Sequence, residues 1–133
     1  PSSSLVKLLD EVIAKYGADP DRVYLTGTSL GAMGAWELAG AAPDKFAAFV
    51  PVCGYGGMSL AKKLTHVPIW AFHGDADDIV SIKPHEELIE EINKRGGRAR
   101  LTVIPGGTHG SVIGPTYDDP EIYSWMQNQA RGQ

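Results

Sequence analysis

The pattern of apolar and polar residues along the chain alternates between a helical period of three to four residues and short apolar runs, which predicts that helices and strands alternate. Residues 4–16 carry apolar side chains every three or four positions, which predicts an amphipathic helix with one buried stripe. The side chains of this stripe are Leu5, Leu8, Leu9, Val12, Ile13 and Tyr16. Gly17 follows the stripe directly and is expected to end the helix.

Short apolar runs predict four strands, at residues 23–28, 46–52, 68–73 and 99–104. The second and third runs are nearly uninterrupted, as is typical of strands covered on both faces of a parallel sheet. Helical periods follow the strands at residues 31–41, 59–64, 83–94 and 120–130, with a loop containing Pro115 before the last. The alternation predicts an α/β fold in one domain over residues 1–133, with about four parallel strands flanked by helices.

Composition narrows the possible partners. The 133 residues are 43% hydrophobic and 21% charged, with a formal net charge of −4 and interspersed signs. This balance provides no basic surface for nucleic acid and no polybasic patch for a membrane. No apolar run approaches the roughly 20 residues that span a bilayer. Cys53 is the single cysteine, which excludes an intrachain disulfide.

Three chemically active residue types follow the ends of the predicted strands. In parallel sheets these ends meet at one edge, where α/β proteins place their sites. Ser29 lies at the centre of a Gly-x-Ser-x-Gly turn after the first strand, and His109 follows the fourth. Asp75, Asp77 and Asp78 follow the third strand. A histidine that takes the serine proton and a carboxylate that orients the histidine are the groups that acyl transfer needs. Spacing alone leaves the choice among the three carboxylates open.

Several motifs resemble one known family. They are Asp-Arg-Val-Tyr-Leu-Thr-Gly-Thr-Ser-Leu-Gly at residues 21–31, Phe-Val-Pro-Val-Cys-Gly at 49–54, Pro-Ile-Trp-Ala-Phe-His-Gly-Asp-Ala-Asp-Asp-Ile-Val at 68–80 and Gly-Gly-Thr-His at 106–109. Together with the closing segment at 120–126, they resemble the C-terminal part of an α/β-hydrolase. The branch is that of dienelactone hydrolases, feruloyl esterases and polyhydroxybutyrate-depolymerase-like esterases. The chain order Ser, Asp, His is also the one that α/β-hydrolases use.

The resemblance implies roles for individual residues. The family pattern His-Gly-x-x-Asp-x-x-Val falls on residues 73–80 and selects Asp77 as the acid. Ser29 is then the nucleophile and His109 the base, and the backbone N–H of Leu30 is one donor to the oxyanion.

The resemblance implies no cofactor and no metal, and the expected partner is a small-molecule ester. Met33, Tyr55 and Met58 are candidate substrate-pocket residues because they lie on the helix and loop nearest the expected site.

The chain departs from the family before Ser29. Family members have further strands there, and one of them ends in a glycine-rich loop that supplies the second oxyanion donor. Residues 4–16 predict a helix instead, so we expect a truncated or minimal domain with weakened activity. The loss of one donor typically costs about 2.7–4 kcal/mol in the transition state. Strand 23–28 is then an open edge, and we expect it to be covered either by an N-terminal portion missing from this sequence or by a second copy of the chain.

Three functions are compatible with these patterns. The first is a serine carboxylic-ester hydrolase that acts on small or aryl esters through an acyl-enzyme. The second is a prolyl-oligopeptidase-type serine peptidase, which shares the serine turn and the acid motif. The third is a trimmed hydrolase module with little activity that serves in assembly or binding.

The remaining histidines and the cysteine have simpler interpretations. His73 ends a buried strand and is expected to hydrogen-bond to the backbone, whereas His66 and His85 are expected at the surface. Cys53 is expected to be a small buried residue at a strand end.

Overall fold

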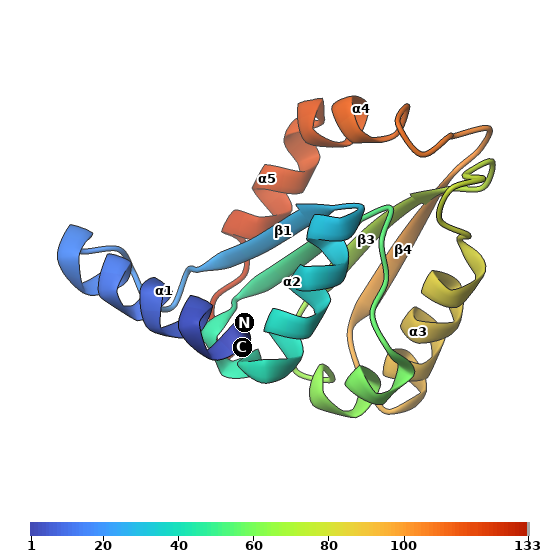
Figure 1. Cartoon of the computed structure of the whole chain (residues 1–133). Coiled ribbons are helices and arrows are strands. Elements are labelled where there is room, and N and C mark those ends of the chain that lie inside the picture. The colour runs from blue at the N-terminus through green and yellow to red at the C-terminus, as the bar shows by residue number, and fades with distance from the viewer. Residues whose placement is uncertain (133) are drawn as a thin grey trace.

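The chain folds around one parallel sheet, which a computed structural model describes for residues 1–132 (Figure 1). Its strands are β1 (Tyr24–Thr28), β2 (Ala48–Val52), β3 (Ile69–Gly74) and β4 (Ala99–Ile104). They pair in the order β1-β2-β3-β4, and every pair is parallel. The predicted α/β class with four parallel strands is therefore confirmed.

Helices cover both faces of the sheet. The helices of the described residues are α1 (Ser2–Tyr16), α2 (Leu30–Ala41), α3 (Lys83–Lys94), α4 (Ile113–Asp118) and α5 (Pro120–Gln127), with short 3₁₀ helices η1 (Pro43–Lys45) and η2 (Met58–Lys63). One core cluster joins α2, η2 and α3 to the sheet, and a second joins α5 to the opposite face (Figure 1). Every residue of β2 and β3 is buried, because helices pack on both of their faces.

The structure differs from the expected elements near the C-terminus. Helix α4 forms where the sequence predicted a loop, and the last helix ends at Gln127 instead of residue 130. Pro115 does not prevent α4, because it lies in the first turn, where its missing N–H has no partner to lose.

The expected burial of the stripe on α1 is wrong. None of the residues of Ser2–Tyr16 is buried, and the side chains of Leu5 and Leu8 remain about half exposed. Helix α1 contacts α2 and lies beside β1, which among residues 1–132 pairs with β2 alone (Figure 1). The stripe therefore borders a groove of about 310 Å³ at an open sheet edge, lined by Leu5, Leu8, Leu9, Val12, Val23, Tyr24, Leu25, Leu38 and Phe46.

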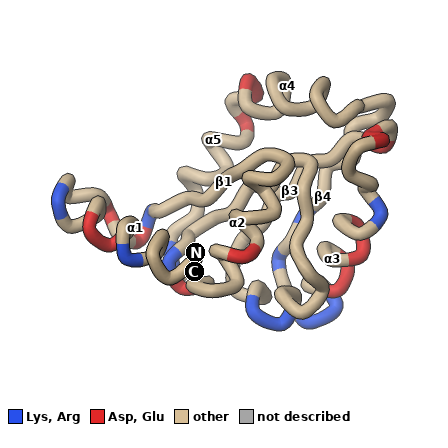
Figure 2. The backbone as a smooth tube through the Cα atoms, viewed as in Figure 1, with Lys and Arg blue, Asp and Glu red and all other residues tan. Residues whose placement is uncertain are grey.

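Charged residues of both signs are mixed along α1 and α3 (Figure 2). Across residues 1–132, no helix combines the length and the apolar character needed to cross a bilayer.

Candidate active site

Ser29 lies in a tight turn between β1 and α2. Its backbone dihedrals, φ 53° and ψ −120°, are unusual for a residue with a side chain and cost about 1–3 kcal/mol. The turn requires glycine at position 27, because a Cβ there would lie 2.6 Å from the carbonyl oxygen of Gly31. The backbone N–H of Ser29 donates to the Val52 carbonyl at 3.0 Å, which ties the turn to the end of β2. These contacts hold the Ser29 hydroxyl at the carboxyl edge of the sheet.

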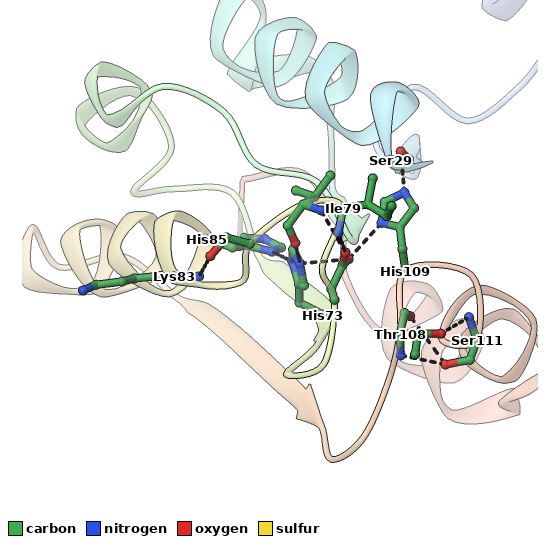
Figure 3. Close-up of polar contacts among 11 residues, drawn as sticks. Ser29, His73, Ile79, Lys83, His85, Thr108, His109 and Ser111 are labelled. Carbon is green, nitrogen blue, oxygen red and sulfur yellow. Dashed lines mark hydrogen bonds and ion pairs between the residues drawn. The ribbon is translucent and has the colours of Figure 1, made fainter.

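A continuous chain of hydrogen bonds joins Ser29 to His109 and Asp77 (Figure 3). Ser29 Oγ lies 2.8 Å from His109 Nε2, and His109 Nδ1 lies 2.8 Å from Asp77 Oδ2. His109 Nδ1 carries the hydrogen in this arrangement, because an ionised carboxylate only accepts. Its Nε2 is then free to accept the proton of the Ser29 hydroxyl.

The Asp77 carboxylate is buried and fixed by its own loop. Its Oδ1 accepts hydrogen bonds from the backbone N–H groups of Ile79 at 3.0 Å and Val80 at 2.8 Å. Burial alone raises the pKa of Asp77, but the hydrogen bonds from Val80, His109 and Ile79 outweigh it and lower the pKa overall. Asp77 is therefore a carboxylate at neutral pH.

The two neighbouring carboxylates lie elsewhere. Asp75 Oδ1 accepts a hydrogen bond from the backbone N–H of Gly106 at 2.7 Å, so Asp75 links the loop after β3 to the loop after β4. Asp78 is exposed to solvent. Of the three candidates that spacing left open, Asp77 is the one that the fold brings to His109.

Leu30 is the first residue of α2, so its backbone N–H has no acceptor within the helix. Its side chain is 80% exposed. Met33 lies in the first turn of α2, Tyr55 in the loop after β2, and Met58 at the start of η2 with its side chain 48% exposed. The pocket role of these three residues stays a prediction.

The expectation that His85 lies at the surface is wrong, because its side chain is fully buried. His85 precedes Leu88, Ile89 and Ile92 at helical spacing on the apolar face of α3. That spacing was the signal in the sequence for its burial. His73 bonds the backbone as expected, with Nε2 2.7 Å from the Val80 carbonyl oxygen.

Cys53 is buried at the end of β2, and burial raises the pKa of its thiol. The thiol is therefore protonated at neutral pH, which disfavours a role as nucleophile. Within the described part of the chain, no group of three or more His, Cys, Asp or Glu side chains is placed to hold a metal ion.

The fold is that of the α/β-hydrolases. A crystal structure of a thermostable esterase superposes with a TM-score of 0.91 at 32% sequence identity, over 98% of this chain and 37% of that one. The sequence profile described as "Dienelactone hydrolase family" matches residues 3–114, and the chain belongs to this family.

Two curated relatives with esterase names are much longer than this chain. Acetylxylan esterase A of Aspergillus awamori is 29% identical over 125 residues, which are 92% of this chain and 39% of that protein. Feruloyl esterase B of Talaromyces funiculosus is 53% identical over 47 residues, which are 35% of this chain and 13% of that protein. The chain thus spans well under half the length of these relatives.

Proposed function

We propose that this chain hydrolyses carboxylic esters through a covalent acyl-enzyme on Ser29. The observation that carries the proposal is the hydrogen-bonded series Ser29 Oγ–His109 Nε2–Asp77 Oδ2, with 2.8 Å at each step. It has the geometry of a nucleophile, a general base and the carboxylate that orients the base. Membership of the dienelactone hydrolase family and the esterase relatives support it.

In the first half of the reaction, Ser29 Oγ attacks the ester carbonyl carbon as His109 Nε2 takes the hydroxyl proton. The negative charge that develops on the carbonyl oxygen is stabilised by the backbone N–H of Leu30 and the N-terminus of α2. His109 then passes its proton to the departing alcohol. Asp77 stabilises the intermediate imidazolium, because it is an ionised carboxylate at 2.8 Å.

In the second half, His109 takes a proton from water, and the hydroxide attacks the acyl carbon. The carboxylic acid leaves and Ser29 regains its proton, so one ester and one water yield one acid and one alcohol. Loss of one oxyanion donor typically slows such a reaction by about 10²–10³-fold, which is the contribution we expect from the Leu30 N–H.

We propose small and aryl esters as the substrates. The relatives support this class, since one is an acetylxylan esterase and another a feruloyl esterase. The peptidase alternative predicts cleavage of peptide p-nitroanilides, and a panel that contains both substrate types distinguishes the two.

The test is a stopped-flow experiment with p-nitrophenyl acetate. We expect a burst of p-nitrophenol equal to the enzyme concentration, followed by a slower steady state. Ser29→Ala should abolish the burst, whereas Ser59→Ala, at an exposed serine of η2, should keep it. A burst that persists in Ser29→Ala removes Ser29 from the chemistry.

We also propose that the open edge of β1 pairs with a second copy of the chain. In the described part of the chain β1 has one strand neighbour, and the adjoining groove on α1 is lined by apolar side chains. Light scattering should give the mass of a dimer, and the β1 amides that face away from β2 should be protected from hydrogen exchange. A monomer at high concentration in which these outward-facing amides are unprotected contradicts the proposal.

A further inference from the structure

A pair of fully buried histidines lies directly behind Asp77. His73 is in β3 and His85 in the first turn of α3, and both side chains have no exposed surface. Their Nδ1 atoms are 3.0 Å apart, and their rings meet edge to face with centroids 5.2 Å apart. Figure 3 shows the pair continuing the row of side chains that begins at Ser29. The acyl-transfer steps above make no use of this pair.

The surrounding acceptors determine where the ring hydrogens lie. His73 Nε2 is 2.7 Å from the Val80 carbonyl oxygen and 3.3 Å from Asp77 Oδ2, and neither oxygen can donate. His73 Nε2 therefore carries a hydrogen. Between the two Nδ1 atoms there is room for one hydrogen, which belongs either to His85 or to His73.

The two possibilities differ in cost. If His73 carried the Nδ1 hydrogen as well, it would be a buried cation, and neutral His85 would hold its own hydrogen on Nε2. Within residues 1–132 His85 Nε2 has no hydrogen-bond partner, so that N–H would be orphaned. If His85 carries the hydrogen on Nδ1, both rings are neutral, and the lone pair of His85 Nε2 is the group left without a partner. Burial, with the neighbouring His73, lowers the pKa of His85 to about 3, which agrees with a neutral ring.

We propose that His73, held in its Nε2–H form by a hydrogen bond from His85, is a positioning residue for the Asp77 carboxylate. Its N–H is directed at the Val80 carbonyl and at Asp77 Oδ2, the same oxygen that His109 contacts. Because the Val80 N–H donates to Asp77 Oδ1, His73 holds both the carboxylate and the peptide segment that fixes it. This inference rests on the proposed function.

The neutral state of the pair matters for the reaction. A cationic His73 would partly neutralise Asp77 and weaken its attraction to the imidazolium that forms on His109. A neutral His73 restrains the carboxylate and leaves its charge available to His109. His85 acts one step further away, because its Nδ1–H leaves His73 Nδ1 as an acceptor and so keeps the His73 hydrogen on Nε2.

Long-range ¹H–¹⁵N correlation spectra of the imidazole rings test the hydrogen placement without reference to activity. We expect His73 with its hydrogen on Nε2 and His85 with its hydrogen on Nδ1 at neutral pH, in the native protein and in Ser29→Ala alike. A doubly protonated His73, or His85 with its hydrogen on Nε2, overturns the proposal. Because the spectra need no substrate, they remain decisive if the ester-hydrolase proposal fails in the burst experiment.

Two variants of His85 test the consequence for catalysis. His85→Leu removes the hydrogen bond that restrains His73 Nδ1, so the His73 ring can turn and loosen its contacts with the Val80 carbonyl and Asp77 Oδ2. We expect kcat to fall about 10–100-fold with KM unchanged, as for other groups that orient a catalytic side chain. His85→Asn keeps an N–H near the Nδ1 position and should recover most of the loss. His66→Asn, at an exposed histidine before β3, is the matched control and should behave as the native protein.

The outcomes separate positioning from a merely structural role. A native kcat in His85→Leu overturns the proposal, as does an equal loss in His85→Leu and His85→Asn. If His85→Leu does not fold, the ring spectra of the native protein still decide.

Discussion

Gly74→Ala should separate Asp77 from His109 without changing either residue. Gly74 ends β3 and packs against Gly107, so an added Cβ would lie 2.1 Å from the Gly107 carbonyl oxygen and 2.4 Å from its carbonyl carbon. Ordinary contact begins near 3.4 Å, so the two backbones must separate by about 1.3 Å. The segments that move are the loop after β3, which carries Asp77, and the loop after β4, which carries His109. Their 2.8 Å contact would lengthen to about 4.1 Å if the whole displacement lay along it, beyond hydrogen-bond distance.

We expect kcat for p-nitrophenyl acetate to fall about 100-fold or more, since a misplacement of about 1 Å can have this effect. The overpacking should also cost about 1–3 kcal/mol of stability, so the assay is run below the unfolding transition measured by circular dichroism. Gly34→Ala is the matched control, because nothing lies within 4 Å of a Cβ at this position in α2. It should keep kcat and gain roughly 0.5–1 kcal/mol of stability. A folded Gly74→Ala with native kcat would show that this close approach does not set the distance between Asp77 and His109.

Three further predictions concern single side chains. In Asp77→Asn, one orientation of the amide places a donor where His109 needs an acceptor, and the other orientation loses the hydrogen bonds from Ile79 and Val80. We therefore expect kcat to fall about 10⁴-fold in steady-state assays. A native kcat with a changed KM contradicts this prediction. The pKa of His85 is about 3 in the folded protein and near 6.5 in the unfolded chain, so between these pH values only the unfolded chain binds the extra proton. The free energy of unfolding should therefore fall as the pH decreases, by up to about 1.4 kcal/mol per pH unit. Urea unfolding between pH 7 and pH 4 measures this, and an equal slope in His85→Asn contradicts it. Cys53 should resist iodoacetamide in the native protein and react in urea, because it is buried with a raised pKa; labelling of the native protein is the contrary result.

The sheet and its crossovers could be predicted because each strand is a short apolar run followed by glycine or a polar loop. The same strand pattern predicts that three segments lie at one edge of the sheet, because each follows a strand end. These segments are Ser29, the Asp75–Asp78 loop and His109. The choice of Asp77 came from a family pattern and not from spacing. In the structure it depends on the backbone N–H groups of Ile79 and Val80, and the direction of such groups is set only by the folded loop.

The exposure of α1, the burial of His85 and the approach of Gly74 to Gly107 depend on tertiary contacts, which the periodicity of a single segment does not predict. The stripe of α1 has the period of a buried face, yet burial requires a partner surface, and β1 ends the sheet beside it. His85 is polar in isolation, but its position on the apolar face of α3 carries it into the core. The close approach of Gly74 to Gly107 joins two loops far apart in the sequence, so neither glycine indicated it alone.

Covalent labelling by a fluorophosphonate shows whether Ser29 is an activated nucleophile. The intact mass should rise by one adduct, and peptide mapping should place that adduct on Ser29. Ser29→Ala should remain unlabelled, and Asp77→Asn should label far more slowly, because its histidine is no longer oriented as a base. A folded native protein that takes up no label, or carries it on another residue, would mean that Ser29 is not the activated nucleophile.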